Sequence, residues 1–296
     1  MKKSTRFLLS FLFCLFWFSL VSAQNTSGSP RGHLLIAGGE DQVRLIMSRF
    51  IDMAGKKDKA KILVIPMASE TPEATGKDKA NKIKGWGVKQ VDYLVVNRKE
   101  ADEDEVVDKL SGYTAIYFSG GSQTLLAKTI VGTKLHKKIQ QMYYDGAVIG
   151  GTSAGAAIMS KVMLTGGEYL DKKNKEESAV IIKSNNIMLR EGLGLLEDVI
   201  IDQHFVKLRR QNRLFTLALE KPQLLGVGID EETAIIVYPD KTMEVIGKSL
   251  VFVFDSAHVE KIKTDNFGNI SGQGIWVHIL SAGDRYDFKT RSILSK

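Results

Sequence analysis

A serine lies in a run of small residues, Gly151-Thr152-Ser153-Ala154-Gly155, which fits the pattern Gly-x-Ser-x-Gly. The residues before this run are typical of an apolar strand and those after it of a helix, so Ser153 would sit at a sharp turn that exposes its hydroxyl as a nucleophile. The run could instead be a packing loop or a phosphate-binding loop. It contains neither the Gly-Lys-Ser/Thr nor the GxGxxG pattern typical of phosphate loops.

A serine hydroxyl needs a base, and the segment Asp202-Gln203-His204-Phe205 places a histidine directly after an apolar run. Histidine, with an ordinary pKa of about 6.5, can accept the serine proton at neutral pH and return it to a leaving group. A lone histidine is also often a packed or surface residue, but a position at the end of a strand favours the catalytic interpretation. We therefore predict that His204 is the base.

A third group must orient the imidazole, and Asp230-Glu231-Glu232 offers carboxylates after another apolar run. We favour Glu231, although an acidic turn without a catalytic role would look the same in the sequence. The oxyanion of an acyl-transfer intermediate also needs donors. The backbone N–H of Ala154 and that of Gly121, which follows Gly120, are the candidates.

Short apolar runs alternate with helical patterns in the first half of the chain, which predicts a mainly parallel sheet with helices on both faces. Loops at the carboxyl ends of such strands gather functional groups, and three of these loops, at 38–41, 120–123 and 150–155, are rich in glycine. The predicted strands are residues 33–37, 62–65, 91–96, 115–118 and 147–150, and the predicted helices include residues 43–53 and 124–144.

Closely spaced apolar runs replace this alternation after about residue 195. We expect them to form an antiparallel extension of the same sheet. The predicted strands are residues 199–202, 226–229, 234–237 and 251–254.

The first 23 residues have the pattern of a signal peptide, with basic residues, an apolar run at 7–21, and Val21-Ser22-Ala23 as a cleavage site. The mature chain would then begin near Gln24 and be exported to the periplasm or the extracellular space. An uncleaved membrane anchor is the alternative. Residues 24–31 look like a flexible leader, and residues 32–296 are predicted to form a single domain.

Composition excludes several classes of function. Cys14, the only cysteine, lies in the predicted signal peptide, so the mature chain would have no cysteine nucleophile, disulfide or thiolate metal site. The five histidines show no metal-ligand spacing, and we predict neither a metal ion nor a cofactor. The net charge of +7 includes three basic residues of the signal peptide, so the mature chain would carry about +4, too little to indicate a nucleic-acid partner.

These segments, taken in order, resemble the cyanophycinase family of serine peptidases, which is related to aspartyl dipeptidase (peptidase E). The resemblance implies a three-layer α/β/α sandwich similar to the class I glutamine amidotransferase fold, with serine in place of cysteine. It also implies a triad of Ser153, His204 and Glu231. The family's substrate pocket falls on Gln123, Asp202 and Gln203. The matching segments are residues 38–41, 120–123, 151–156, 202–205, 228–231 and 280–284.

Members of that family cleave cyanophycin, a polyaspartate with arginine on each β-carboxyl, to β-aspartyl-arginine. Arg210 and Arg213 match two family arginines and would bind substrate carboxylates, unless they lie on a solvated helix face. The family's first arginine falls on Leu208, between Lys207 and Arg209, and leucine cannot bind a carboxylate.

The predicted function is therefore an exported serine-type peptidase acting on aspartate-containing peptides. The alternatives are an isoaspartyl or aspartyl dipeptidase-like hydrolase and a non-catalytic binding protein on the same fold. The sequence leaves open whether the chain forms a homodimer.

Overall fold

The computed structural model describes residues 28–40, 44–170 and 180–295. The predicted signal peptide, residues 1–23, and residues 24–27 of the predicted leader lie outside these ranges. Among the helices in the described ranges, none has both the length and the apolar character needed to cross a membrane.

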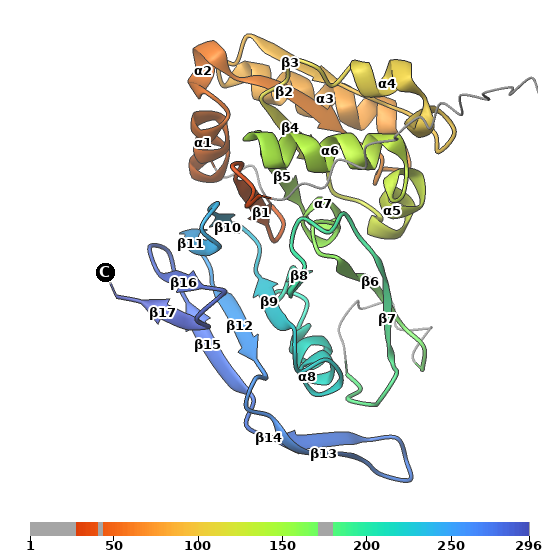
Figure 1. Cartoon of the computed structure of the whole chain (residues 1–296), viewed down its shortest axis with the longest axis vertical. Coiled ribbons are helices and arrows are strands. Elements are labelled where there is room, and N and C mark those ends of the chain that lie inside the picture. Colours follow the sequence, from red (N-terminus) through yellow and green to blue (C-terminus); the bar gives the residue numbers. More distant parts are fainter. Residues whose placement is uncertain (1–27, 41–43, 171–179, 296) are drawn as a thin grey trace, which may run out of the picture.

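A main sheet of mixed direction forms the centre of the molecule (Figure 1). Its strands are β1 (Leu34–Ala37), β2 (Lys61–Ile65), β3 (Gln90–Tyr93), β4 (Ala115–Phe118), β5 (Val148–Thr152), β10 (Thr233–Val237), β11 (Thr242–Gly247), β16 (Arg285–Asp287) and β17 (Ser292–Leu294). Their order in the sheet is β17-β16-β11-β10-β1-β5-β4-β2-β3. Strands β1, β5, β4, β2 and β3 pair in parallel, whereas β10, β11, β16 and β17 continue the sheet in antiparallel pairs. The predicted parallel sheet with an antiparallel extension is confirmed.

The prediction that every later strand joins this sheet is wrong. Only the predicted strand at 234–237 does so, as β10. The other three belong to a second sheet in the order β15-β12-β9-β8, in which β8 and β9 are parallel. Its strands are β8 (Val199–Gln203), β9 (Leu225–Ile229), β12 (Val251–Asp255) and β15 (Trp276–Leu280). A buried strand reads as the same short apolar run in either sheet, so the pattern does not specify its partner.

Helices and two hairpins complete the chain. The helices are α1 (Arg44–Met53), α2 (Lys56–Lys59), α3 (Pro72–Gly85), the 3-10 turn η1 (Glu100–Asp102), α4 (Asp104–Asp108), α5 (Gln123–Ile130), α6 (Lys134–Asp145), α7 (Ala154–Ala157) and α8 (Gln211–Glu220). The hairpins pair β6 (Val162–Glu168) with β7 (Ile187–Glu191), and β13 (Glu260–Thr264) with β14 (Ile270–Gln273). The helix predicted over residues 124–144 is in fact two, α5 and α6, because Thr133 caps the start of α6 by accepting a hydrogen bond from the His136 N–H.

Alternating side chains of the central strands divide the core into layers. Leu34 and Ile36 of β1 pack into one apolar cluster with α5, α6 and the inner face of the second sheet. Leu35 and Ala37 pack into another cluster with α1 and α3 on the opposite face. Helix α8 covers the outer face of the second sheet through Leu214 and Leu217. The main sheet therefore lies between two layers, which confirms the predicted sandwich.

Candidate active site

The predicted strand, turn and helix around Ser153 are present. Ser153 follows the last residue of β5 and precedes α7, and its φ of 52° is a conformation that non-glycine residues rarely adopt. Its N–H donates to the Ala37 carbonyl of β1 at 3.0 Å. The neighbouring glycines are required by close packing: a Cβ on Gly151 would lie 2.4 Å from the Gly155 oxygen, and one on Gly155 would lie 2.4 Å from the Phe118 oxygen.

Ser153, His204 and Glu231 form a continuous row of hydrogen bonds. The distance from His204 Nε2 to Ser153 Oγ is 2.9 Å, and that from His204 Nδ1 to Glu231 Oε1 is 2.8 Å. When Nδ1 carries the proton, the imidazole donates to the carboxylate and its Nε2 accepts from the serine hydroxyl. The side chains of His204 and Glu231 are 21% and 22% exposed, so the row is shielded yet open to a ligand.

The adjacent carboxylate of Glu232 makes a different contact. Its Oε1 lies 2.8 Å from Lys248 Nζ in an exposed ion pair, and the Glu232 side chain is 44% exposed. Glu231 is thus the acidic residue of this segment that contacts the imidazole directly.

Asp230, the third carboxylate of the segment, holds the backbone that follows His204. Its Oδ1 accepts hydrogen bonds from the N–H groups of Val206 and Lys207 at 3.1 and 2.9 Å. Its Oδ2 accepts from the Ser249 hydroxyl at 2.6 Å. Because His204 has a positive φ of 51°, these bonds help to fix a turn that is unusual for a non-glycine residue. The sequence contained this aspartate but carried no sign of its role.

The loop after β1 contacts both the backbone and the imidazole of His204. The Gly38 carbonyl accepts a hydrogen bond from the His204 N–H at 2.8 Å, and the Gly39 carbonyl accepts one from the Glu232 N–H at 3.0 Å. The imidazole packs directly on Gly39, where a Cβ would lie 2.3 Å from His204 Cε1. Gly39 also has a φ of 143°, so this position needs glycine for two reasons.

Replacing Gly39 with alanine is expected to lower kcat about 100-fold, because the methyl group would displace the imidazole from Ser153 and small misplacements of catalytic groups cost about this much. Steady-state kinetics on a cleaved peptide would measure the effect. Gly112→Ala is the matched control, since Gly112 has a φ of 83° but a Cβ there would meet only open space. Equal activity of the two variants would show that Gly39 does not position the ring.

A cavity of about 410 Å³ opens beside Ser153 and His204. Besides Ser153 and His204, four more of the predicted site residues line it, together with Thr165 and Gly166 of β6: Gly121, Gln123, Gln203 and Arg210. The wall from β6 was not predicted, because nothing in the sequence indicated that this hairpin packs against the turn after β8. Gln123 fixes part of that wall by donating from Nε2 to the Leu164 carbonyl at 3.2 Å.

The two predicted carboxylate-binding arginines lie in different places. Both are buried, at 5% and 3% exposure, which excludes a solvated helix face. Arg210 lines the cavity, and its Nη1 donates to the Gln203 carbonyl at 2.7 Å. Arg213 is not among the residues that line the cavity: its Nη1 contacts Asp202 Oδ1 at 3.4 Å and its Nη2 donates to the Gly166 carbonyl at 3.0 Å. Arg213 thus joins the end of β8 to the β6 wall.

The remaining predicted site residues surround the cavity. Asp202 is fully buried beside Arg213. Ala154 is the first residue of α7, so the Ala154 N–H has no acceptor within that helix. Gly120 lies against the Ser153 side chain, with a Cβ position 3.4 Å from the serine Cβ. The segment in which leucine replaces a family arginine does not line the cavity: Leu208 is half-buried, and the Lys207 side chain is 67% exposed.

The chain matches the model of peptidase family S51 over residues 33–245. It is 35% identical over 282 residues to the cyanophycinase of Synechococcus elongatus, an alignment that covers 92% of this chain and 84% of that protein. It is 34% identical over 267 residues to the cyanophycinase of Geminocystis herdmanii, covering 87% of this chain and 93% of that protein.

Two solved structures share the fold. A peptidase from an acI-B1 actinobacterium superposes with a TM-score of 0.64 at 23% identity, covering 88% of this chain and 98% of that one. A putative peptidase E protein from Listeria monocytogenes superposes with a TM-score of 0.51 at 19% identity, covering 74% and 99%. The family match and the identity to the cyanophycinases extend over most of the chain, which therefore belongs to peptidase family S51 and is a serine-type peptidase.

Proposed function

We propose that this peptidase hydrolyses aspartate-containing peptides through Ser153, His204 and Glu231. The observation that carries the proposal is the row of hydrogen bonds from the serine hydroxyl through the imidazole to the carboxylate, at 2.9 and 2.8 Å. This arrangement has the contacts that a nucleophile, a base and an orienting acid require.

The chemistry follows from these contacts. Ser153 Oγ attacks the scissile carbonyl carbon while His204 Nε2 takes its proton, and the N–H groups of Ala154 and Gly121 stabilise the resulting oxyanion. The imidazolium then gives the proton to the leaving nitrogen, which leaves an acyl group on Ser153. A water molecule then attacks the ester carbonyl while His204 takes its proton, and the imidazolium returns this proton to Ser153 Oγ as the acyl–oxygen bond breaks. Glu231 stabilises the imidazolium in both halves of the reaction.

The cavity supports an acidic substrate. Arg210 is the one arginine or lysine among the described lining residues. Its Nη1 donates to the Gln203 carbonyl and lies 3.9 Å from Asp202 Oδ1, and because a guanidinium has five N–H donors it can bind a substrate carboxylate as well. Gln203 Oε1 is buried without a hydrogen-bond partner among the described residues, so it can accept a bond from a substrate N–H. The relatives from Synechococcus elongatus and Geminocystis herdmanii are named cyanophycinase, which makes cyanophycin the first polymer to test.

A direct test incubates the purified protein with cyanophycin and with a panel of α- and β-aspartyl dipeptides, and identifies the products by mass. Release of β-aspartyl-arginine from cyanophycin, faster than by Ser153→Ala, is the expected result. Cleavage of the dipeptides alone would favour the dipeptidase-like alternative. No cleavage of any of them would contradict the proposed substrate class.

Replacing Arg210 with methionine is expected to lower kcat/KM for an acidic peptide by about 10- to 100-fold, mostly through KM, because a charge-assisted hydrogen bond to the substrate carboxylate is lost. The effect should shrink for a peptide whose carboxyl groups are amidated. Arg209→Met is the matched control, since Arg209 is exposed and does not line the cavity. Equal losses in both variants would rule out a specific contact by Arg210.

Export is a further part of the proposal, supported by the signal-peptide pattern of residues 1–23. Sequencing the N-terminus of protein expressed with its leader in a secreting bacterial host tests this part. We expect a chain that begins near Gln24 in the periplasm or the medium. An intact N-terminus in the cytosolic or the membrane fraction would contradict it.

A further inference from the structure

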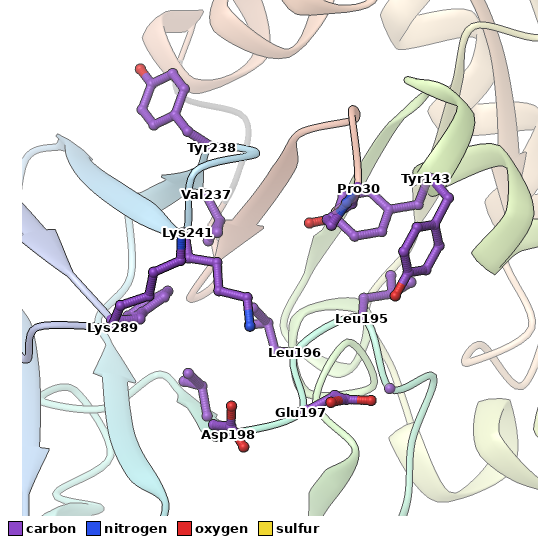
Figure 2. Close-up of a pocket in the computed structure, with 14 residues that line it drawn as sticks. Pro30, Tyr143, Leu195, Leu196, Glu197, Asp198, Val237, Tyr238, Lys241 and Lys289 are labelled. Carbon is purple, nitrogen blue, oxygen red and sulfur yellow. The ribbon is translucent and has the colours of Figure 1, made fainter. Parts of the chain in front are cut away.

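A second cavity, of about 140 Å³, lies near the amino end of strand β1, whereas Ser153 lies near its carboxyl end. The register places it there: Val237, which lines this cavity, pairs with Leu34 at the start of β1, whereas Ser153 bonds to Ala37 at its end. The cavity lies where the end of α6, the segment before β8, the β10–β11 turn and the residues after β16 meet (Figure 2). Its apolar lining residues are Leu195, Leu196, Val199, Val237 and Phe288.

Charges of both signs line the same cavity. Lys241 and Lys289 supply two cations, and Glu197 and Asp198 supply two carboxylates. All four side chains are exposed, and none of them forms an ion pair with any residue in the described part of the chain. Opposite charges thus line one cavity without contacting each other, which leaves room for a ligand that carries both.

Tyr143 adds a polar group that is not exposed. Its side chain is 3% exposed and lines the cavity, yet its hydroxyl has no hydrogen-bond partner among the described residues. Burial raises the pKa of Tyr143, with a smaller effect from Tyr144, so the hydroxyl stays protonated and can donate at neutral pH. The hydroxyl of Tyr238, which lines the same cavity, is engaged with Glu244. The Tyr143 hydroxyl is not among the fully buried polar atoms that lack a partner, so it is accessible from the cavity, where a ligand can accept its hydrogen bond.

We propose that this cavity binds a small zwitterion of the amino-acid or dipeptide class, at a site distinct from the active site. Lys241 and Lys289 bind its carboxylate, and Glu197 and Asp198 bind its ammonium or guanidinium group. The Tyr143 hydroxyl donates to the ligand, and the apolar lining packs against its methylene groups. A ligand with one sign of charge would leave two like charges of the cavity without a partner.

The test uses isothermal titration calorimetry with an aspartyl-arginine dipeptide as the probe, on a Ser153→Ala background that does not consume it. We expect two binding events. Adding Arg210→Met should weaken the event at the active site about 10- to 100-fold and leave the other unchanged. Adding Lys241→Met and Lys289→Met to that variant should weaken the remaining event about tenfold or more. The paired substitutions Lys161→Met and Lys263→Met, at exposed lysines that do not line the cavity, are the matched control.

The outcomes separate this proposal from the proposed function. If the active site does not accept the dipeptide, a single event sensitive to Lys241 and Lys289 is still expected. A single event that Arg210→Met weakens and the lysine substitutions do not, or a second event that the lysine substitutions leave unchanged, would overturn the second site. Succinate, which has the carboxylates but no cation, should bind there about tenfold more weakly than the dipeptide. Equal binding of succinate would contradict a zwitterionic ligand.

Discussion

Ser153→Ala is expected to lower kcat for peptide hydrolysis by about 10⁶-fold, the loss that follows when a triad nucleophile is removed. The hydroxyl that lies 2.9 Å from His204 Nε2 would be gone, and no acyl-enzyme could form. Burst-phase and steady-state kinetics on the best substrate of the peptide panel would measure the loss. Circular dichroism should show an unchanged fold, because alanine fits the same turn between β5 and α7.

Ser111→Ala is the control for this substitution, since Ser111 is an exposed loop serine far along the chain from the turn. Its activity should match that of the parent protein. Residual hydrolysis by Ser153→Ala within about tenfold of the parent would show that another group attacks the carbonyl, since the remaining machinery alone gives only a small part of the rate.

Glu231→Gln is expected to lower kcat by about 10⁴-fold, with a much smaller effect on KM. Glutamine keeps the size of the side chain, but its amide carries no charge to stabilise the imidazolium and can hold the ring in the wrong tautomer. The neighbouring Glu232→Gln provides a control of the same chemistry, because Glu232 pairs with Lys248 at the surface. It should change kcat by less than about twofold, as expected for a surface ion pair.

A reversed pattern would contradict the assignment of the orienting acid. If Glu232→Gln lost the activity and Glu231→Gln kept it, the 2.8 Å contact between Glu231 and His204 would have no catalytic role. The residue types alone could not make this distinction, because three carboxylates follow one another and any of them could reach the imidazole; the resemblance to the cyanophycinase family is what pointed to Glu231.

The row of hydrogen bonds from Ser153 through His204 to Glu231 was predictable because these residues follow the ends of strands. Ser153 lies after β5 and His204 after β8, so each side chain lies at the edge of a sheet where functional groups gather. The burial of both faces of the central strands was equally readable. Leu34 and Leu35 are apolar because both faces of β1 are covered, which a continuous apolar run indicates.

Which strands pair with one another could not be predicted in the same way. The residues of β8, β9 and β12 are as apolar as those of β10, but they form a separate sheet. What distinguishes them is the α8 crossover between β8 and β9, and residues 211–220 were not among the predicted helices. A crossover helix indicates parallel pairing and would have argued against a simple antiparallel extension.

The arginines illustrate a second limit. Arg210 and Arg213 are three residues apart and have the same chemistry, yet one lines the cavity and the other joins Asp202 to Gly166. Both contact the end of β8, which lies just before them in the sequence, but the Gly166 carbonyl that Arg213 meets comes from β6, 47 residues away. Spacing on one segment therefore could not separate a residue that meets the substrate from one that holds the cavity wall.

The most direct test of the catalytic row is labelling with a fluorophosphonate, which reacts with activated serine hydroxyls, followed by mass spectrometry of the digested protein. We predict one adduct, on the peptide that contains Ser153, with labelling lost in Ser153→Ala and slowed about 100-fold or more in His204→Ala because the base is missing. A folded protein that hydrolyses peptides but carries no adduct on Ser153, or labels equally fast without His204, would contradict the row of Ser153, His204 and Glu231 as the catalytic machinery.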